Sequence, residues 1–149
     1  MKRIPTGFPI VILSSLLIML MLSFSTYGEE LVDATADYDT NNVFARILRG
    51  ELPADIVFES EYALAFHDIS PRAKVHVLVI PKGSFTNILQ FNQNASNEEK
   101  LGLLDAISQT ATIMGVDESG FRLVSNTGRD AGQTVPHFHV HLMGGEHVQ

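Results

Sequence analysis

Near its C-terminus the chain reads Pro136-His137-Phe138-His139-Val140-His141-Leu142-Met143-Gly144-Gly145. Histidine and apolar residues alternate here, which is typical of a β-strand with one face in the core. Side chains two residues apart lie on the same face of a strand, about 7 Å from each other. The segment therefore predicts a strand over Phe138–Met143, with three imidazoles in a row on one face. Three imidazoles bring six polar nitrogens that need partners, so they indicate chemistry rather than core filling.

A polar, glycine-containing stretch comes directly before this strand: Asn126-Thr127-Gly128-Arg129-Asp130-Ala131-Gly132-Gln133-Thr134. Two glycines, a hydroxyl group and several main-chain N–H groups give a loop that is able to wrap around an anion. Its position next to the histidines predicts a phosphate-binding loop.

The preceding segments predict short strands and two helices. Apolar spacing indicates a short helix over Val43–Arg49, with Asn41 or Asn42 as its cap and Gly50 at its end. A longer helix begins with a capping box at Ser96 and Glu99 and ends at Gly115. Its apolar positions recur every three or four residues, and they are Leu101, Leu104, Ile107, Ala111 and Met114.

The strand pattern sets the fold class. Ile56–Glu59 and Tyr62–His67 have the pattern of a hairpin, and Val75–Ile80 and Phe121–Ser125 predict two more strands. The early connections are too short for helical crossovers. We therefore expect an α+β fold: an antiparallel sheet of about five strands, with one long and one short helix on one face.

The N-terminus differs in composition from the rest of the chain. Residues 1–28 start with Lys2-Arg3 and continue with an apolar run over residues 8–24. This predicts a signal peptide or a membrane anchor, with membrane attachment through residues 8–24 in the second case. The expected location is export, periplasmic or secretory, or the membrane, ahead of the cytoplasm or an organelle. Residues 29–41 are acidic and unpatterned and predict a linker, and residues 42–149 form the domain.

Charge and cysteine content exclude several classes of function. The net charge of the chain is −7, and all seventeen acidic residues follow residue 28. Nucleic-acid binding relies on clustered Lys and Arg, so no nucleic-acid partner is expected. The absence of cysteine excludes disulfide scaffolds, thiolate zinc sites and thiol catalysis.

Several blocks of this chain together resemble a known family. His137–Met143 matches the signature of the histidine triad (HIT) superfamily, in which three histidines alternate with apolar residues. The blocks Phe66–Pro71, His76–Lys82 and Gly132–Thr134 are similar to those of its Hint-like nucleotide-binding branch. The resemblance implies a homodimeric α+β protein that hydrolyses purine nucleoside phosphoramidates or related nucleoside 5′-monophosphate derivatives. It implies no cofactor and no metal.

The resemblance also implies roles for individual residues. His139 would attack the phosphorus and form a nucleotidyl-histidine intermediate, while His137 and His141 would donate to phosphoryl oxygens or the leaving group. His76 would support the triad from the neighbouring strand, and Asp68 would accept from the ribose hydroxyls. The phosphate would lie among Asn126, Gly132, Gln133 and Thr134. The wall around the purine would consist of Val43, Phe44, Ile47, Leu52, Phe66, His67 and Ile69.

Three other interpretations remain open from the sequence. The histidines could hold Zn²⁺ with a water molecule, as in zinc hydrolases. The domain could bind nucleotides with little turnover. It could also cleave dinucleoside polyphosphates, as other branches of the superfamily do.

Overall fold

The computed structural model describes residues 30–148 of the chain. The apolar run over residues 8–24, predicted as a signal peptide or membrane anchor, lies outside them and stays a prediction. Between residues 30 and 148, no helix combines the length and the hydropathy needed to cross a membrane.

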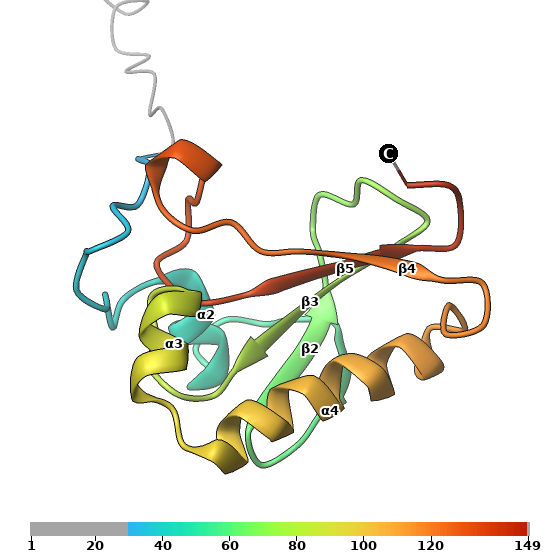
Figure 1. The fold of residues 1–149 in the computed structure, drawn as a ribbon, viewed down its shortest axis with the longest axis horizontal. Helices are drawn as coiled ribbons and strands as arrows, with labels where there is room; N and C mark the ends of the chain where they lie inside the picture. Colours follow the sequence, from blue (N-terminus) through green and yellow to red (C-terminus); the bar gives the residue numbers. More distant parts are fainter. Residues whose placement is uncertain (1–29, 149) are drawn as a thin grey trace, which may run out of the picture. The chain divides into compact units, whose positions relative to one another are not determined.

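A five-stranded antiparallel sheet forms the centre of the domain, in the order β1-β2-β3-β5-β4 (Figure 1). The strands are β1 (Ile56–Glu59), β2 (Ala63–His67), β3 (Val75–Pro81), β4 (Phe121–Val124) and β5 (Val140–Gly144). The predicted hairpin is present as β1 and β2, and the predicted α+β class is confirmed.

The helices begin and end at residues with clear capping roles. The Asn42 side chain caps α2 (Val43–Leu48) by accepting from two main-chain N–H groups. In α4 (Asn97–Ile113), Ser96 and Glu99 form the predicted capping box, and Gly115 follows with a φ of +67°. The sequence did not predict α3 (Ile88–Asn94), because its apolar residues are too few to show a helical period.

Helices cover both faces of the sheet, which corrects the expectation of helices on one face. Alternate residues of β2 and β3 point to opposite sides, and apart from His67 and His76 both sets are apolar. One set packs against α4, and it consists of Ala63, Ala65, Val77 and Val79. The other set packs against α2, and it consists of Leu64, Phe66, Leu78 and Ile80. Strands that are apolar on both faces need a cover on each side.

The predicted linker is part of the compact domain, which is a second correction. Residues 31–41, here named the strap, lie against the domain and do not link it freely. Val32 is buried, and its N–H donates to the carbonyl of Gln133 at 2.8 Å. Asn87 and Gln90 donate from their side-chain amides to main-chain carbonyls of the strap at 2.8 and 2.9 Å. The strap is thus tied down by polar contacts with main-chain atoms, which leave no hydropathy pattern in the sequence.

Strand β5 begins two residues later than predicted. The N–H of Phe138 donates to the carbonyl of Phe85, outside the sheet, so the ladder starts only at Val140. The predicted division into two faces holds nevertheless. Phe138, Val140 and Leu142 pack in the core on the α4 side, which places the three histidines on the α2 side.

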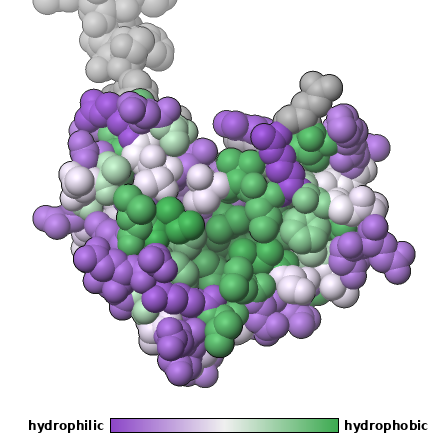
Figure 2. Space-filling view, in the orientation of Figure 1, coloured by the Kyte–Doolittle hydropathy of each residue, from purple (hydrophilic) through white to green (hydrophobic). Residues whose placement is uncertain are grey.

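One stripe of α4 is apolar but faces solvent. Leu101 and Leu104, which belong to the predicted apolar series of this helix, are 66% and 65% exposed, whereas Leu103 and Ala106 are buried. The edge strand β4 also exposes the apolar side chains of Phe121 and Leu123. Figure 2 shows a broad apolar area on the face where Figure 1 has α4 and β4.

Candidate active site

His139 has one ring nitrogen held by the protein and the other free. Its Nδ1–H donates to the main-chain carbonyl of His137 at 2.7 Å. A carbonyl oxygen only accepts, so the proton of the neutral ring lies on Nδ1 and the lone pair lies on Nε2. Among the described residues, no group bonds to this Nε2. The ring of Phe44 packs edge-on against the imidazole at 5.2 Å and holds its plane. The arrangement presents a nucleophilic lone pair in a fixed direction.

His137 is fully buried, and both of its ring nitrogens are occupied. Nε2 lies 2.9 Å from the carbonyl of Pro81, and Nδ1 lies 2.6 Å from the hydroxyl of Tyr38. This corrects the expectation that His137 donates to a phosphoryl oxygen, because no donor of its ring is left for a ligand. His137 supports His139 through its carbonyl and is a positioning residue.

His76 and His141 form a directed pair across β3 and β5. The main-chain N–H of Arg72 donates to Nδ1 of His76 at 3.0 Å, so the proton of neutral His76 lies on Nε2. That Nε2 is 2.9 Å from Nδ1 of His141, which therefore accepts and keeps its own proton on Nε2. The ring of His141 lies 5.1 Å from that of His139. The pair thus leaves His141 with an N–H donor on Nε2, on a ring that lies next to the ring of His139.

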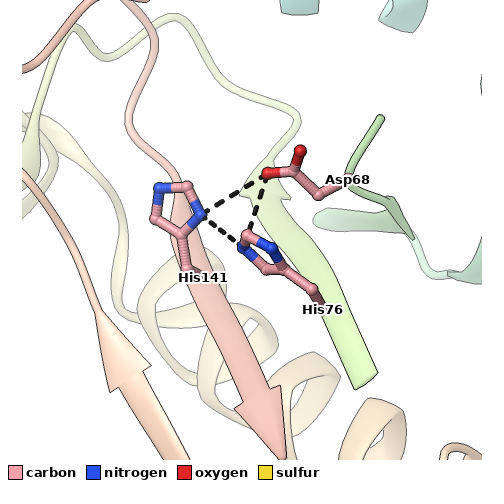
Figure 3. Close-up of side chains that lie close together, drawn as sticks. All are labelled: Asp68, His76 and His141. Atoms are coloured by element: carbon pink, nitrogen blue, oxygen red, sulfur yellow. Dashed lines mark hydrogen bonds and ion pairs between the residues drawn. The ribbon is translucent and has the colours of Figure 1, made fainter. Parts of the chain in front are cut away.

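Asp68 lies beside this pair, as Figure 3 shows. Its Oδ2 is 3.4 Å from Nε2 of His76 and 3.7 Å from Nδ1 of His141. Its Oδ1 accepts from the N–H of Ser70 at 2.8 Å. The sequence predicted only a ribose contact for Asp68, and the position of its charge next to two histidines is an additional feature.

Burial keeps the four histidines of the site neutral. It lowers the pKa of His137 to about 4. It lowers the pKa of His141 to about 4 as well, with help from the neighbouring His139 and His76. Burial also lowers the pKa of His139 and of His76, and in both cases the charge of Asp68 opposes the change. At neutral pH the site therefore holds neutral imidazoles, and the free Nε2 of His139 is nucleophilic without losing a proton.

The side chain of Gln133, one of the predicted site residues, holds the glycine-containing loop in place. Gln133 is buried, and its side chain accepts from the N–H of Gly128 at 2.9 Å and donates to the carbonyl of Thr86 at 2.7 Å. The Gln133 side chain therefore braces the loop, and the expected position of the phosphate among the residues of this loop stays a prediction. Gly132 adopts a φ of +72° after a 3₁₀ turn over Arg129–Ala131. Thr134 and Gly132 are exposed and Asn126 is partly exposed, so these three remain available to a ligand.

The predicted purine wall divides into core and surface residues. Phe44 and Phe66 are buried and pack edge-on against each other at 5.5 Å, so they belong to the core beneath the site. Ile69 is fully exposed and Val43 is 41% exposed. Ile47 and Leu52 are partly buried. Side chains two residues apart in a strand share a face, so His67 lies on the same face of β2 as Ala65. Ala65 packs toward α4, and the side chain of His67 therefore lies on the face of the sheet opposite the triad.

Sequence reasoning missed two side chains that hold the site. Tyr38 bonds to His137 from the strap, and its only sequence signal was a lone aromatic in an acidic stretch. Ser125 donates from its hydroxyl to the carbonyl of His139 at 2.8 Å and fixes the backbone of that residue. A serine at the end of a strand carries no signal that separates this role from an ordinary turn.

One group of side chains in the described part of the chain has the composition of a metal site. One ligand atom each from Asp68, His76 and His141 lies within 4.8 Å of the others. Two imidazoles and a carboxylate suit Zn²⁺. The 2.9 Å contact between Nε2 of His76 and Nδ1 of His141 is a hydrogen bond, and a metal ion would have to displace its proton.

Known proteins share both this sequence and this fold. The HIT domain family matches residues 49–148. An uncharacterized HIT-like protein of Azospirillum brasilense is 50% identical over 111 residues, which cover 74% of this chain and 91% of that protein. The purine nucleoside phosphoramidase of Escherichia coli (strain K12) is 42% identical over 107 residues, which cover 69% of this chain and 86% of that enzyme.

Solved structures agree with the sequence matches. A HIT family hydrolase from Legionella pneumophila superposes with a TM-score of 0.68 at 39% identity, covering 73% of this chain and 96% of that one. A histidine triad protein from Clostridium difficile gives a TM-score of 0.69 at 32% identity, covering 74% and 96%. The family match spans both the Asp68 block and the three histidines. By its sequence, its fold and the arrangement of these histidines, this chain belongs to the HIT family and is similar to the hydrolases within it.

Proposed function

We propose that this protein hydrolyses purine nucleoside phosphoramidates or related nucleoside 5′-monophosphate derivatives, with His139 as the nucleophile. The observation that carries the proposal is the hydrogen bond from Nδ1–H of His139 to the carbonyl of His137. It leaves Nε2 as a free lone pair on a neutral ring. The named activity of the Escherichia coli relative supports the substrate class.

The reaction would proceed in two displacements at phosphorus. Nε2 of His139 attacks, the P–N bond to the amine breaks, and the amine leaves with a proton taken from solvent water. A second water then attacks the nucleotidyl-histidine, the bond from phosphorus to Nε2 breaks, and the proton that this water releases returns to the solvent. Covalent capture replaces one difficult step by two easier ones. Nε2–H of His141 donates to the phosphoryl group in both steps and stabilises its developing charge.

The remaining groups would bind the substrate. Thr134 offers its hydroxyl and Asn126 its amide to the phosphoryl group, whereas the N–H of Gly132 already donates to the carbonyl of Arg129 at 3.0 Å. Asp68 accepts from the ribose hydroxyls with lone pairs that its contact with Ser70 leaves free. Ile69 and Val43 provide exposed apolar surface for the base.

Turnover of adenosine 5′-phosphoramidate by the full chain tests the proposal. We expect release of adenosine monophosphate by the wild-type protein. We expect loss of about a thousandfold or more in kcat for His139→Ala, since no other nucleophile replaces the ring. His147→Ala is the matched control, because His147 is exposed near the C-terminus, and it should keep wild-type activity. Wild-type activity in His139→Ala would refute the assignment.

A zinc-dependent hydrolase is the second candidate, and one observation favours it. Asp68, His76 and His141 bring three suitable ligand atoms together. These three side chains would hold Zn²⁺, which would supply an activated water, and the reaction would then need no covalent intermediate on His139. The two candidates differ in their response to chelators.

We also infer that a second copy of the chain covers the apolar surface of α4 and β4. Strand β4 is at the edge of the sheet, so it has unpaired main-chain groups that a symmetric partner strand could bond. Exposed Leu104 and Leu123 lie on these two elements. Sedimentation should show a dimer for the wild-type chain and a monomer for Leu123→Glu. Leu89→Glu on α3 is the matched control and should stay dimeric, and a monomeric wild-type chain would contradict the inference.

A further inference from the structure

Tyr38 reaches the triad from outside the region that matches the family. It lies in the strap, whereas the HIT domain match begins at residue 49. Its hydroxyl is 2.6 Å from Nδ1 of His137, and the two rings pack edge to face at 5.5 Å. Such a short contact to a fully buried nitrogen needs an explanation beyond packing.

The surroundings of His137 decide which atom carries the proton. The carbonyl of Pro81 only accepts, so Nε2 of His137 must donate to it. In the neutral ring, Nδ1 is then the acceptor, and the Tyr38 hydroxyl must donate to it. The opposite tautomer would place two lone pairs against each other at Nε2 and the Pro81 carbonyl, 2.9 Å apart.

The strap holds Tyr38 in place at several points. The Val32 N–H, the Ala34 carbonyl and the Ala36 carbonyl all bond to the body of the domain. Ala34 also lies against Gly128, where an added Cβ would come within 2.9 Å of the Ala34 Cβ. The hydroxyl of Tyr38 is therefore delivered by a fixed segment and not by a free tail.

We propose that Tyr38 is a positioning residue for the reaction: by donating to Nδ1 of His137, it fixes the tautomer and orientation of that ring. His137 in turn presents its carbonyl to Nδ1–H of His139. The chain of contacts runs from the Tyr38 hydroxyl, through the His137 ring and backbone, to the nucleophile. Tyr38 touches no substrate, so its removal should change the chemical step and leave binding alone. The kinetic part of this inference rests on the proposed function.

The test is Tyr38→Phe in the full chain, which keeps the ring and removes the hydroxyl. Loss of the donor leaves a buried acceptor without a partner. We expect kcat for adenosine 5′-phosphoramidate to fall about tenfold, with KM within about twofold of wild type. Tyr62→Phe is the matched control: it makes the same change in the β1–β2 turn and should leave both constants unchanged.

A second readout does not depend on turnover. The ¹⁵N shifts of labelled histidines report which ring nitrogen carries the proton. In the wild-type chain, we expect His137 protonated on Nε2 and His139 on Nδ1, and in Tyr38→Phe we expect the His137 signals to shift or broaden. If wild-type His137 is protonated on Nδ1, or if Tyr38→Phe changes neither the shifts nor kcat, the proposal is wrong. A wild-type chain without turnover but with the expected shifts would refute the proposed function and not the role of Tyr38.

Discussion

The carbonyl of His137 accepts a 2.7 Å hydrogen bond from the imidazole of His139, two residues further along the chain. This single contact joins a buried histidine, whose ring is occupied on both sides, to a histidine with a free nitrogen. The three histidines of the triad therefore have different roles. His137 orients, His139 presents the lone pair, and His141 presents an N–H from a ring held by His76.

Asp68→Asn tests the electrostatic part of this arrangement. The Asp68 charge raises the pKa of His139 and of His76, against the larger lowering by burial. Removing it should lower the pKa of His139 further. Attack needs the neutral ring, so the acidic limb of the kcat profile should move to lower pH.

The same substitution should weaken ribose binding. Loss of charge-assisted hydrogen bonds predicts a rise in KM of about tenfold. Asp105→Asn on the exposed side of α4 is the control and should leave the pH profile and KM unchanged. An acidic limb that stays in place or moves to higher pH would show that Asp68 does not act on the nucleophile.

The buried histidines predict a loss of stability in mild acid. A histidine whose pKa is lower in the folded state stabilises the fold fully above its unfolded pKa of about 6.5. For His137, this contribution is lost as the pH falls from about 6.5 to about 4, because the unfolded chain takes up the proton first. The loss amounts to about 3 kcal/mol of unfolding free energy for this one residue.

Urea unfolding at pH 7 and pH 5 measures more than half of this loss, about 2 kcal/mol for His137, since the rest follows between pH 5 and about pH 4. Asp33 and Glu51, whose pKa values are lowered by hydrogen bonds to Thr35 and Arg49, stabilise the fold throughout this range and lose that contribution only as the pH falls further, so the two effects occur in separate ranges. An unfolding free energy that stays constant between pH 7 and pH 5 would mean that His137 is not buried in the neutral form.

Metal removal separates the two candidate functions. With a covalent mechanism on His139, we expect dialysis against a chelator to leave kcat and KM unchanged. The same preparation should contain less than one zinc ion in ten chains by elemental analysis. A loss of activity on chelation that Zn²⁺ restores would favour metal chemistry at Asp68, His76 and His141.

The sequence predicted the fold class and the triad because both depend on patterns of type and spacing. Alternation placed Phe138, Val140 and Leu142 in the core, and the cap at Ser96 marked the start of α4. The helical spacing of apolar residues could not separate the buried stripe of α4 from its exposed apolar stripe. Leu104 and Ile107, three residues apart, fit the same helical period, but only Ile107 is buried in the core.

The contacts that tune the site could not be predicted in the same way. Gln133 belongs to a loop with an anion-binding composition, yet its side chain bonds only to the protein. Tyr38 and His137 are separated by about a hundred residues of sequence, and the link between them is one hydroxyl. Such contacts depend on where the backbone passes, and no local pattern encodes that path.

The intermediate on His139 is the central claim, and mass spectrometry of a quenched reaction tests it most directly. The full chain is mixed with adenosine 5′-phosphoramidate, quenched in base to protect the phosphorus–nitrogen bond, and digested. We predict one adenylyl group on the peptide that contains residues 137–141, assigned by fragmentation to His139 and absent from His139→Ala. An active enzyme that shows no adduct at any quench time, or an adduct on another residue, would contradict it.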